Sequence, residues 1–136
     1  MTKEELKKYV KMDAQLKRLE QAIAETRSWL EKPSSTAWSF SPSSAGRKRD
    51  LSDGIAKLEA LLDDYNARWD ALIDERARIE AAIAAIADPV EQALLGYRYV
   101  DGLQWEQICV KLNYSWAQTH RVHASALKNI AEPQSQ

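Results

Sequence analysis

The chain has 136 residues, of which 45% are hydrophobic, with only 4 glycines and 4 prolines. This length suits one compact domain, or a small domain with an extended element, and the composition favours helix. No segment reaches the roughly 18 unbroken apolar residues of a membrane span, and the N-terminus lacks the apolar core of a signal peptide. We therefore expect a soluble, cytoplasmic protein without a membrane partner. The single Cys109 and two histidines argue against an internal disulfide and a zinc site, so we expect no cofactor or metal.

The net charge of −1 conceals an uneven distribution of charged residues. Residues 1–50 carry 11 Lys and Arg against 7 Asp and Glu, residues 51–88 carry 4 against 9, and residues 89–136 carry 4 against 4. The basic first part and the acidic second part attract each other if they lie side by side.

Apolar residues recur with heptad spacing in the first segment, from Thr2 to about Lys32. The a/d pattern predicts a helix that lies along a partner helix, and Thr2 with Glu5 predicts a capping box at its start. The predicted seam positions are Tyr9, Met12, Leu16, Leu19, Ile23, Thr26 and Leu30. The Ser-rich segment 32–50 breaks this pattern with two prolines and predicts a loop, in which Trp38 and Phe40 either fold back or contact a partner.

The heptad pattern returns at Leu51 and continues to about Ala87. A helix of this length is roughly 55 Å long and needs a partner along its whole length. Its predicted seam positions are Leu51, Ile55, Leu58, Leu62, Tyr65, Trp69, Leu72, Ile79, Ile83 and Ile86. We predict an all-α protein in which residues 1–87 form a long antiparallel coiled-coil helical hairpin. Part of the second stripe stays uncovered, so this hairpin is also the predicted site of oligomerisation.

A second domain is predicted from the sequence ADPVE, residues 87–91. Asp88 is suited to cap a new helix, Pro89 fits its first position, and Glu91 stands three residues after the cap. The prediction for this domain, residues 88–131, is a helix over 89–99, a turn over 100–103, a helix over 104–112, a corner over 113–115 and a helix over 116–130. A flexible tail, 132–136, follows.

The two helices around the corner have the residues that a helix-turn-helix requires. Ile108 and Leu112 lie on one face of the first helix, and Cys109 is small enough for a close approach. Asn113 tolerates a left-handed backbone better than most residues, and Ser115 is suited to cap the next helix. The inward stripe of that helix is predicted to be Thr119, Val122, Ala126 and Ile130.

A family resemblance rests on residues 94–130, which read LLGYRYVDGLQWEQICVKLNYSWAQTHRVHASALKNI. The matching positions are Arg98, Tyr99, Val100, Asp101, Gly102, Trp105, Glu106, Ile108, Tyr114, Ser115, Arg121, Val122, His123, Ala126 and Leu127. This stretch resembles the C-terminal part of small phage-encoded proteins whose helix-turn-helix is similar to region 4 of bacterial sigma factors. The resemblance implies a phage or prophage regulator of late-gene transcription in the cytoplasm of a bacterial host, with double-stranded DNA and RNA polymerase as partners.

The resemblance also implies that the helix 116–130 enters the major groove of DNA, while the helix before it crosses the backbone. The predicted base contacts are Trp116, Ala117, Gln118, His120 and Arg121, and the predicted phosphate contacts are Lys111, Ser115 and Lys128. Gln118 and Arg121 are favoured because Gln pairs with adenine and Arg with guanine in two-point geometry. The neutral module attracts phosphates weakly, so a homodimer that reads a two-fold site is expected.

Two other functions remain open from the residues alone. A small terminase-like DNA-packaging protein also joins a helix-turn-helix to a helical hairpin, but usually carries the DNA module first in the chain. A structural coiled-coil adaptor without DNA binding is compatible with the neutral charge of residues 89–136. An enzyme is not expected, since no nucleophile or paired carboxylate accompanies His120 or His123.

Overall fold

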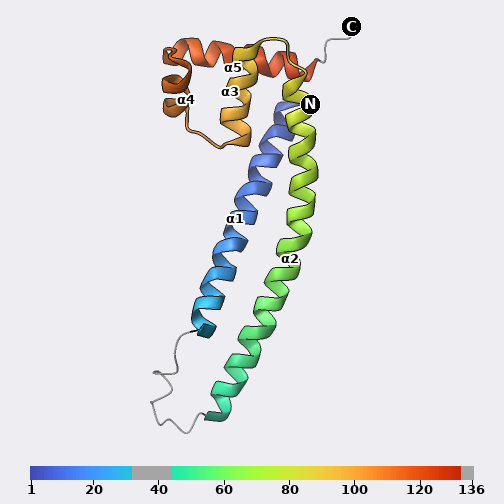
Figure 1. Ribbon diagram of the computed structural model, residues 1–136, viewed down its shortest axis with the longest axis vertical. Helices are drawn as coiled ribbons and strands as arrows, with labels where there is room; N and C mark the ends of the chain where they lie inside the picture. The colour runs from blue at the N-terminus through green and yellow to red at the C-terminus, as the bar shows by residue number, and fades with distance from the viewer. Residues whose placement is uncertain (32–43, 133–136) are drawn as a thin grey trace. The chain divides into compact units, whose positions relative to one another are not determined.

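The computed structural model describes residues 1–31 and 44–132, and the side chains of residues 1–31 and 51–132 (Figure 1). Every element in these ranges is helical, which confirms the prediction of an all-α protein. The helices are α1 (Lys3–Glu31), α2 (Ser44–Ala84), α3 (Pro89–Leu95), the π-helical turn η2 (Gly96–Val100), α4 (Trp105–Leu112) and α5 (Trp116–Ala131). None of these described helices is both long and apolar enough to cross a membrane. The predictions for Trp38, Phe40 and the tail 133–136 lie outside the described residues.

The chain divides into two compact units, and α1 and α2 each contribute to both. One unit, here called the helical pair, comprises residues 14–70. The other, here called the helix-turn-helix unit, comprises residues 1–13 and the chain from residue 71 onward. The domain boundary predicted at Asp88 coincides with the turn after α2 but falls inside the helix-turn-helix unit.

The second long helix begins earlier than predicted. α2 starts at Ser44 rather than Leu51, so the end of the predicted loop 32–50 is helical. Residues 44–50 contain Ala, Arg and Lys, which favour helix, and no proline interrupts the chain between Pro42 and Pro89. The α-helical part ends at Ala84, three residues before the predicted end, and the amide of Ile86 donates to the Ile83 carbonyl at 3.0 Å in a tighter last turn.

In the helical pair, the segments of α1 and α2 run antiparallel. Tyr65 Oη donates to Glu20 Oε1 at 2.9 Å, and an Arg68 guanidinium nitrogen donates to Gln15 Oε1 at 2.8 Å, so rising numbers in α2 meet falling numbers in α1. The predicted seam residues Leu16 and Ile23 are buried. Three predicted seam positions of α2 are nevertheless 42–49% exposed, namely Leu51, Ile55 and Trp69.

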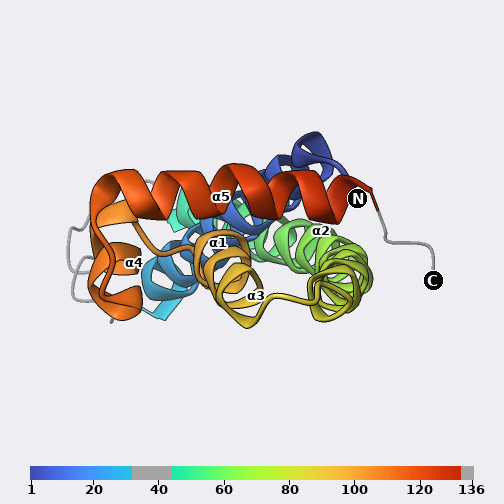
Figure 2. The same cartoon turned by 90° about the horizontal axis from the view of Figure 1, so that it is seen from above.

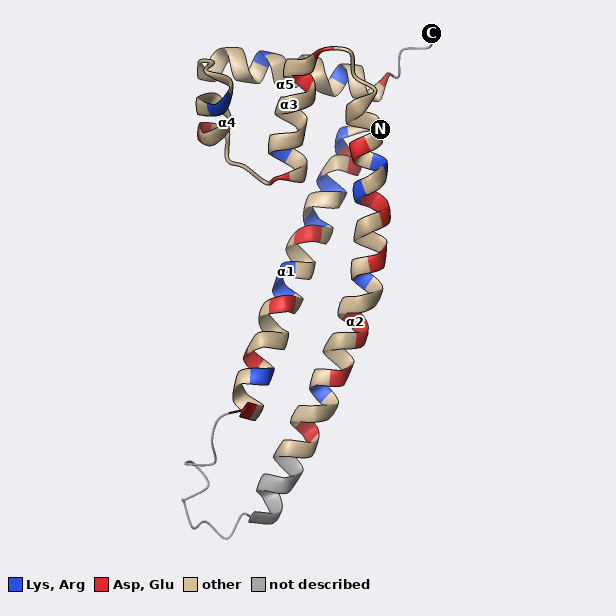
Figure 3. Cartoon of the chain, in the orientation of Figure 1, with Lys and Arg blue, Asp and Glu red and all other residues tan. Residues whose placement is uncertain are grey.

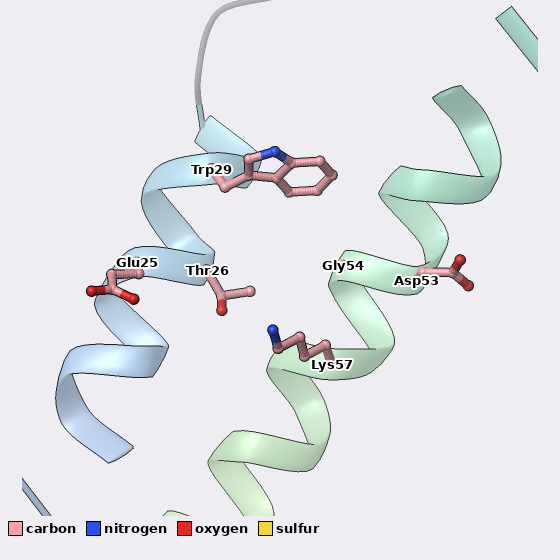
Figure 4. A pocket seen from close by; sticks show the side chains of 6 residues that line it. All are labelled: Glu25, Thr26, Trp29, Asp53, Gly54 and Lys57. Carbon is pink, nitrogen blue, oxygen red and sulfur yellow. The ribbon is translucent and has the colours of Figure 1, made fainter. Parts of the chain in front are cut away.

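Close approach of the two helices explains a glycine in the interior of α2. The Trp29 side chain extends from α1 toward Gly54, and a Cβ atom at residue 54 would lie 2.7 Å from Trp29 Cζ3 and 3.0 Å from Leu30 Cδ2 (Figure 4). Glycine therefore costs some helix propensity at this position but leaves room for the indole ring. The shallow pocket around this contact is lined by Glu25, Thr26, Trp29, Asp53, Gly54 and Lys57.

The helix-turn-helix unit begins with the predicted capping box. The Thr2 amide donates to Glu5 Oε2 at 2.8 Å, and the Glu5 amide donates to Thr2 Oγ1 at 3.3 Å. These bonds hold the first turn of α1, while Arg78 of α2 lies 3.5 Å from the Glu5 carboxylate. The buried apolar residues of this unit come from both long helices and from the C-terminal helices, and are Leu6, Tyr9, Leu72, Ile79, Ile83, Ile86, Leu94, Leu95, Tyr99, Ile108, Ala126 and Ile130.

The turn from α2 into α3 has the predicted cap but a different role for Glu91. Asp88 Oδ1 accepts from the Val90 amide at 2.8 Å, and Pro89 occupies the first helical position. Glu91 does not close a capping box. Glu91 is only 5% exposed, and its carboxylate accepts from Ser125 Oγ at 2.5 Å and Asn129 Nδ2 at 2.7 Å. These bonds fix α3 to α5, which lies across α3 and α4 (Figure 2).

The predicted single helix over 89–99 is also divided. After Leu95 the chain widens into the π-helical turn η2, in which the Asp101 amide donates to the Gly96 carbonyl at 2.9 Å. Gly102 then takes a left-handed conformation with φ 71°, which ends the turn before α4. Short π-helical segments occur often near functional sites, and this one carries Arg98 and Tyr99.

Candidate nucleic-acid interface

The corner between α4 and α5 has the predicted backbone geometry. Asn113 is left-handed, with φ 57° and ψ 43°, and its amide donates to the Val110 carbonyl at 3.2 Å. Ser115 caps α5 through its hydroxyl, which accepts from the Gln118 amide at 3.1 Å. In return, Gln118 Oε1 accepts from the Ser115 amide at 2.9 Å, which completes a capping box. The corner is therefore fixed by local bonds on both sides.

Packing between α4 and α5 follows the predicted inward stripe, with one exception. Ile108, Thr119 and Ala126 are fully buried. Cys109 Sγ donates to Thr119 Oγ1 at 3.3 Å, and that hydroxyl donates to the Ser115 carbonyl at 2.9 Å, so the small cysteine occupies the crossing point. Val122, by contrast, is only partly buried. The two helices thus hold one relative orientation through a buried apolar and hydrogen-bonded contact.

The opposite face of α5 is exposed and carries most of the predicted base contacts. Ala117, Gln118 and Arg121 are exposed, and Trp116 is 53% exposed. Arg121 Nε donates weakly to the Ala117 carbonyl at 3.5 Å, which leaves the terminal nitrogens of its guanidinium accessible. The predicted phosphate contacts Lys111, Ser115 and Lys128 are exposed as well.

The side chain of Gln118 is already engaged in the capping box. A two-point contact with adenine needs both the oxygen and the nitrogen of the amide, and the oxygen here accepts from the Ser115 amide. Gln118 must give up that bond to read adenine in this way, whereas its amide nitrogen can donate to a base or phosphate without any change.

His120 is less outward than predicted, because its side chain is partly buried. Its ring lies between Trp105 and Trp116, with centroid distances of 4.5 Å to each. Its Nε2 is buried and has no hydrogen-bond partner among the described residues. The two indoles cover the imidazole because Trp105 opens α4 beside the first turns of α5, so His120 supports Trp116 from behind.

His123 packs inside the unit and is partly buried. Its Nε2 lies 2.8 Å from Tyr99 Oη, and its ring meets the Trp105 ring edge-on at 4.6 Å. Burial, which is the largest cause, together with electrostatic interactions with Lys3, His120 and Arg98, lowers the pKa of His123 to about 4. His123 is therefore neutral near pH 7 and links η2 to α5 through a neutral hydrogen bond.

Arg98 was given no role from the sequence, and its side chain is partly buried beside Trp105. Its guanidinium donates to the Leu103 carbonyl at 3.1 Å and lies 4.6 Å from the centre of the Trp105 ring. The pairing of an arginine with a tryptophan seven residues later was the available signal, but the π-helical turn that brings them together was not foreseen. Arg98 is consequently not part of the exposed face of α5.

Charges of both signs are sparse on α4 and α5, as the scattered blue and red segments of Figure 3 show. One of the cations on these helices, Lys111, has its Nζ 5.4 Å from the centre of the Tyr97 ring. No group of three or more His, Cys, Asp or Glu residues in the described parts of the chain is arranged to hold a metal ion. The exposed face of α5 thus offers hydrogen-bond donors and a few cations.

The comparisons with known proteins identify a family. No curated protein and no solved structure was found to match the chain. Residues 32–131, which are 100 of the 136 residues, match the family described as protein of unknown function DUF1492. This description assigns no activity, so the resemblance to sigma-factor region 4 stays a prediction. The chain belongs to the DUF1492 family.

Proposed function

We propose that this protein is a sequence-specific DNA-binding regulator of transcription, of phage or prophage origin, that inserts α5 into the major groove. The observation that carries the proposal is the fixed α4–α5 corner, which exposes Ala117, Gln118 and Arg121 on the first turns of α5. A helix-turn-helix reads DNA with these same turns of its second helix.

Each exposed side chain has a chemical role in this proposal. Arg121 donates two bonds to the O6 and N7 atoms of guanine, and Ala117 contacts a thymine methyl group. Gln118 contacts an adenine after exchanging its capping bond, and the Trp116 ring edge packs against the sugar or a thymine methyl group. Lys111, Ser115 and Lys128 contact phosphates, which fix the register of the helix. His120 is left out of the base contacts because it is partly buried and its ring contacts Trp105 and Trp116.

Two copies of the chain act together in this proposal. Residues 89–136 carry 4 Lys and Arg against 4 Asp and Glu, so one copy gains little from phosphate neutralisation. The exposed apolar side chains Leu51, Ile55 and Trp69 of the helical pair provide surface for a homodimer. RNA polymerase is the further partner that the resemblance suggests, in the cytoplasm of a bacterial host.

Selection of bound sequences from random duplex DNA with the full chain tests the proposal, with a parallel measurement of mass in solution. We expect a two-fold site and a dimer. Arg121→Ala then weakens binding to the selected site by about 1–3 kcal/mol, roughly 5- to 150-fold, and relaxes the preference at one base pair. Fluorescence anisotropy with labelled duplex measures this change.

The matched control is Arg27→Ala, which removes the same charge from an exposed position of the helical pair. This variant keeps the affinity of the original chain. Equal loss in both variants assigns the effect of Arg121 to net charge rather than to a base contact. Absence of any salt-dependent binding refutes the proposal and favours the adaptor, while a ring of many copies favours DNA packaging.

A further inference from the structure

A cavity of about 460 Å³ opens within the helix-turn-helix unit, between the first turns of α1 and the start of α4. The residues of its lining that matter here are Lys3, Lys7, Lys11, Arg98, Trp105 and His123. Ligand sites for small molecules commonly have volumes of about 300–1,000 Å³. The cavity is therefore large enough for a molecule of the size of a mononucleotide.

The lining is strongly basic. Lys3, Lys7 and Lys11 are spaced four residues apart, so they share one face of α1, where Figure 3 shows basic positions near the start of the helix. The cavity wall contains no Asp or Glu, and no carboxylate among the described residues forms an ion pair with the three lysines or with Arg98. Four cations thus line one cavity, and none of them forms an ion pair with a carboxylate of the described residues.

The positive charge of the lining affects the pKa of His123. His123 lines the cavity, and besides burial, which is the largest cause, the charges of Lys3, His120 and Arg98 lower the pKa of its imidazole. The smaller, electrostatic part of this shift comes from cations that also attract an anion in the cavity, and Lys3 and Arg98 line its wall. A bound anion fits this field better than a cation or a neutral polar molecule.

The remaining wall is apolar and aromatic. Val10, which is 41% exposed, and the rings of Tyr99 and Trp105 form it, while Tyr99 Oη is engaged with His123. Arg98 and His120 already contact the Trp105 ring, at 4.6 Å and 4.5 Å. The ligand body therefore packs against apolar surface beside the indole instead of stacking on its open face.

We propose that this cavity binds a small phosphorylated molecule, with its phosphates on Lys3, Lys7 and Lys11 and its apolar or planar body against Val10 and Tyr99. Phosphate is favoured over a single carboxylate because it carries more charge and more acceptor oxygens for several ammonium groups at once.

The backbone of DNA bound to α5 does not explain the cavity. His123 follows Arg121 by two residues, which places the two side chains about 200° apart around the helix. Arg121 is exposed, whereas His123 is partly buried against Tyr99 and Trp105. The cavity and the proposed base-reading face thus lie on different sides of α5.

Isothermal titration calorimetry of the full chain tests this inference with pyrophosphate, ADP and adenosine as probes. We expect ADP to bind more tightly than pyrophosphate, because its body contacts the apolar wall, and adenosine to bind at least tenfold more weakly than ADP. The double variant Lys7→Gln, Lys11→Gln lowers the affinity for ADP at least tenfold. The control Lys8→Gln removes a lysine of the same helix that does not line the cavity, and changes this affinity less than twofold.

Circular dichroism checks that each variant keeps its helix content. We expect no change, because the substituted residues Lys7, Lys8 and Lys11 are exposed. Lack of heat with both pyrophosphate and ADP overturns the inference, as does an equal loss of ADP affinity in Lys8→Gln. If the double variant loses affinity for the selected DNA but not for ADP, the lysines serve DNA and the inference fails. Arg121→Ala leaves ADP binding unchanged, so this result is separable from that of the DNA proposal.

Discussion

The low pKa of His123 makes the stability of the helix-turn-helix unit depend on pH in a way that can be measured. Burial, and to a smaller degree electrostatic interactions with Lys3, His120 and Arg98, lower this pKa to about 4, whereas an imidazole in the unfolded chain has a pKa of about 6.5. Below the higher value the unfolded chain takes up a proton that the folded chain does not, so the free energy of unfolding falls as the pH is lowered toward 4 and then levels off. With these two pKa values, the loss between neutral pH and pH 5 is about 2 kcal/mol. Since His123 is only partly buried, solvent screening reduces the expected loss to about 1 kcal/mol.

Urea unfolding followed by far-UV circular dichroism, at about pH 7.5 and about pH 5, measures the change. The comparison chain is His123→Gln, which keeps a polar side chain near Tyr99 Oη but does not titrate. We expect its free energy of unfolding to fall by about 1 kcal/mol less than that of the original chain over the same interval. Titratable groups that do not interact with His123 contribute equally in both chains and cancel in the difference. Equal losses in the two chains refute the reasoning, because the imidazole of His123 then has the same pKa folded and unfolded.

Two further predictions concern the corner and the core beneath it. Asn113→Val costs about 1–2 kcal/mol of stability, because a branched side chain opposes the left-handed backbone, whereas Asn113→Gly is close to neutral. Urea unfolding of the two variants separates the effect of backbone strain from the effect of losing the amide group. Ile108 is fully buried, so Ile108→Ala costs about 2–5 kcal/mol of stability. Val110 on the same helix is 80% exposed, so Val110→Ala costs less than about 0.5 kcal/mol in the same assay. Similar losses for both variants would place Ile108 outside the core.

The sequence was sufficient to predict the parts of this fold that depend on local chemistry. Asp88, Asn113 and Ser115 each act through atoms within a few residues along the chain, as a cap, a left-handed corner and a second cap. The boundaries of α4 and α5 followed to within one residue, and the end of α4 and the start of α5 are fixed by Asn113 and Ser115, which act on near neighbours.

Two features that depend on particular distant partners were not predicted. Glu91 carries the local signal of a capping box, yet its carboxylate bonds to Ser125 and Asn129, more than 30 residues away, because burial against α5 offers two donors at once. His120 has a polar side chain at an outward-looking spacing, but two tryptophans brought together by the fold cover it. Helical periodicity alone does not predict these contacts.

The small number of exposed cations limits how α5 can hold DNA. Arg98 lies against Trp105, and Arg121 is assigned to a base, so Lys111 and Lys128 are the cations left for phosphates on α4 and α5. The slope of log affinity against log salt concentration steepens by about 0.9 for each neutralised phosphate. With two phosphate-binding lysines in each copy, the slope is about 1.8 for one copy and about 3.6 for two. A fourfold rise in salt therefore weakens one copy about 12-fold and a dimer about 150-fold. A slope near the lower value on a two-fold site would contradict the proposal that both copies engage the duplex together.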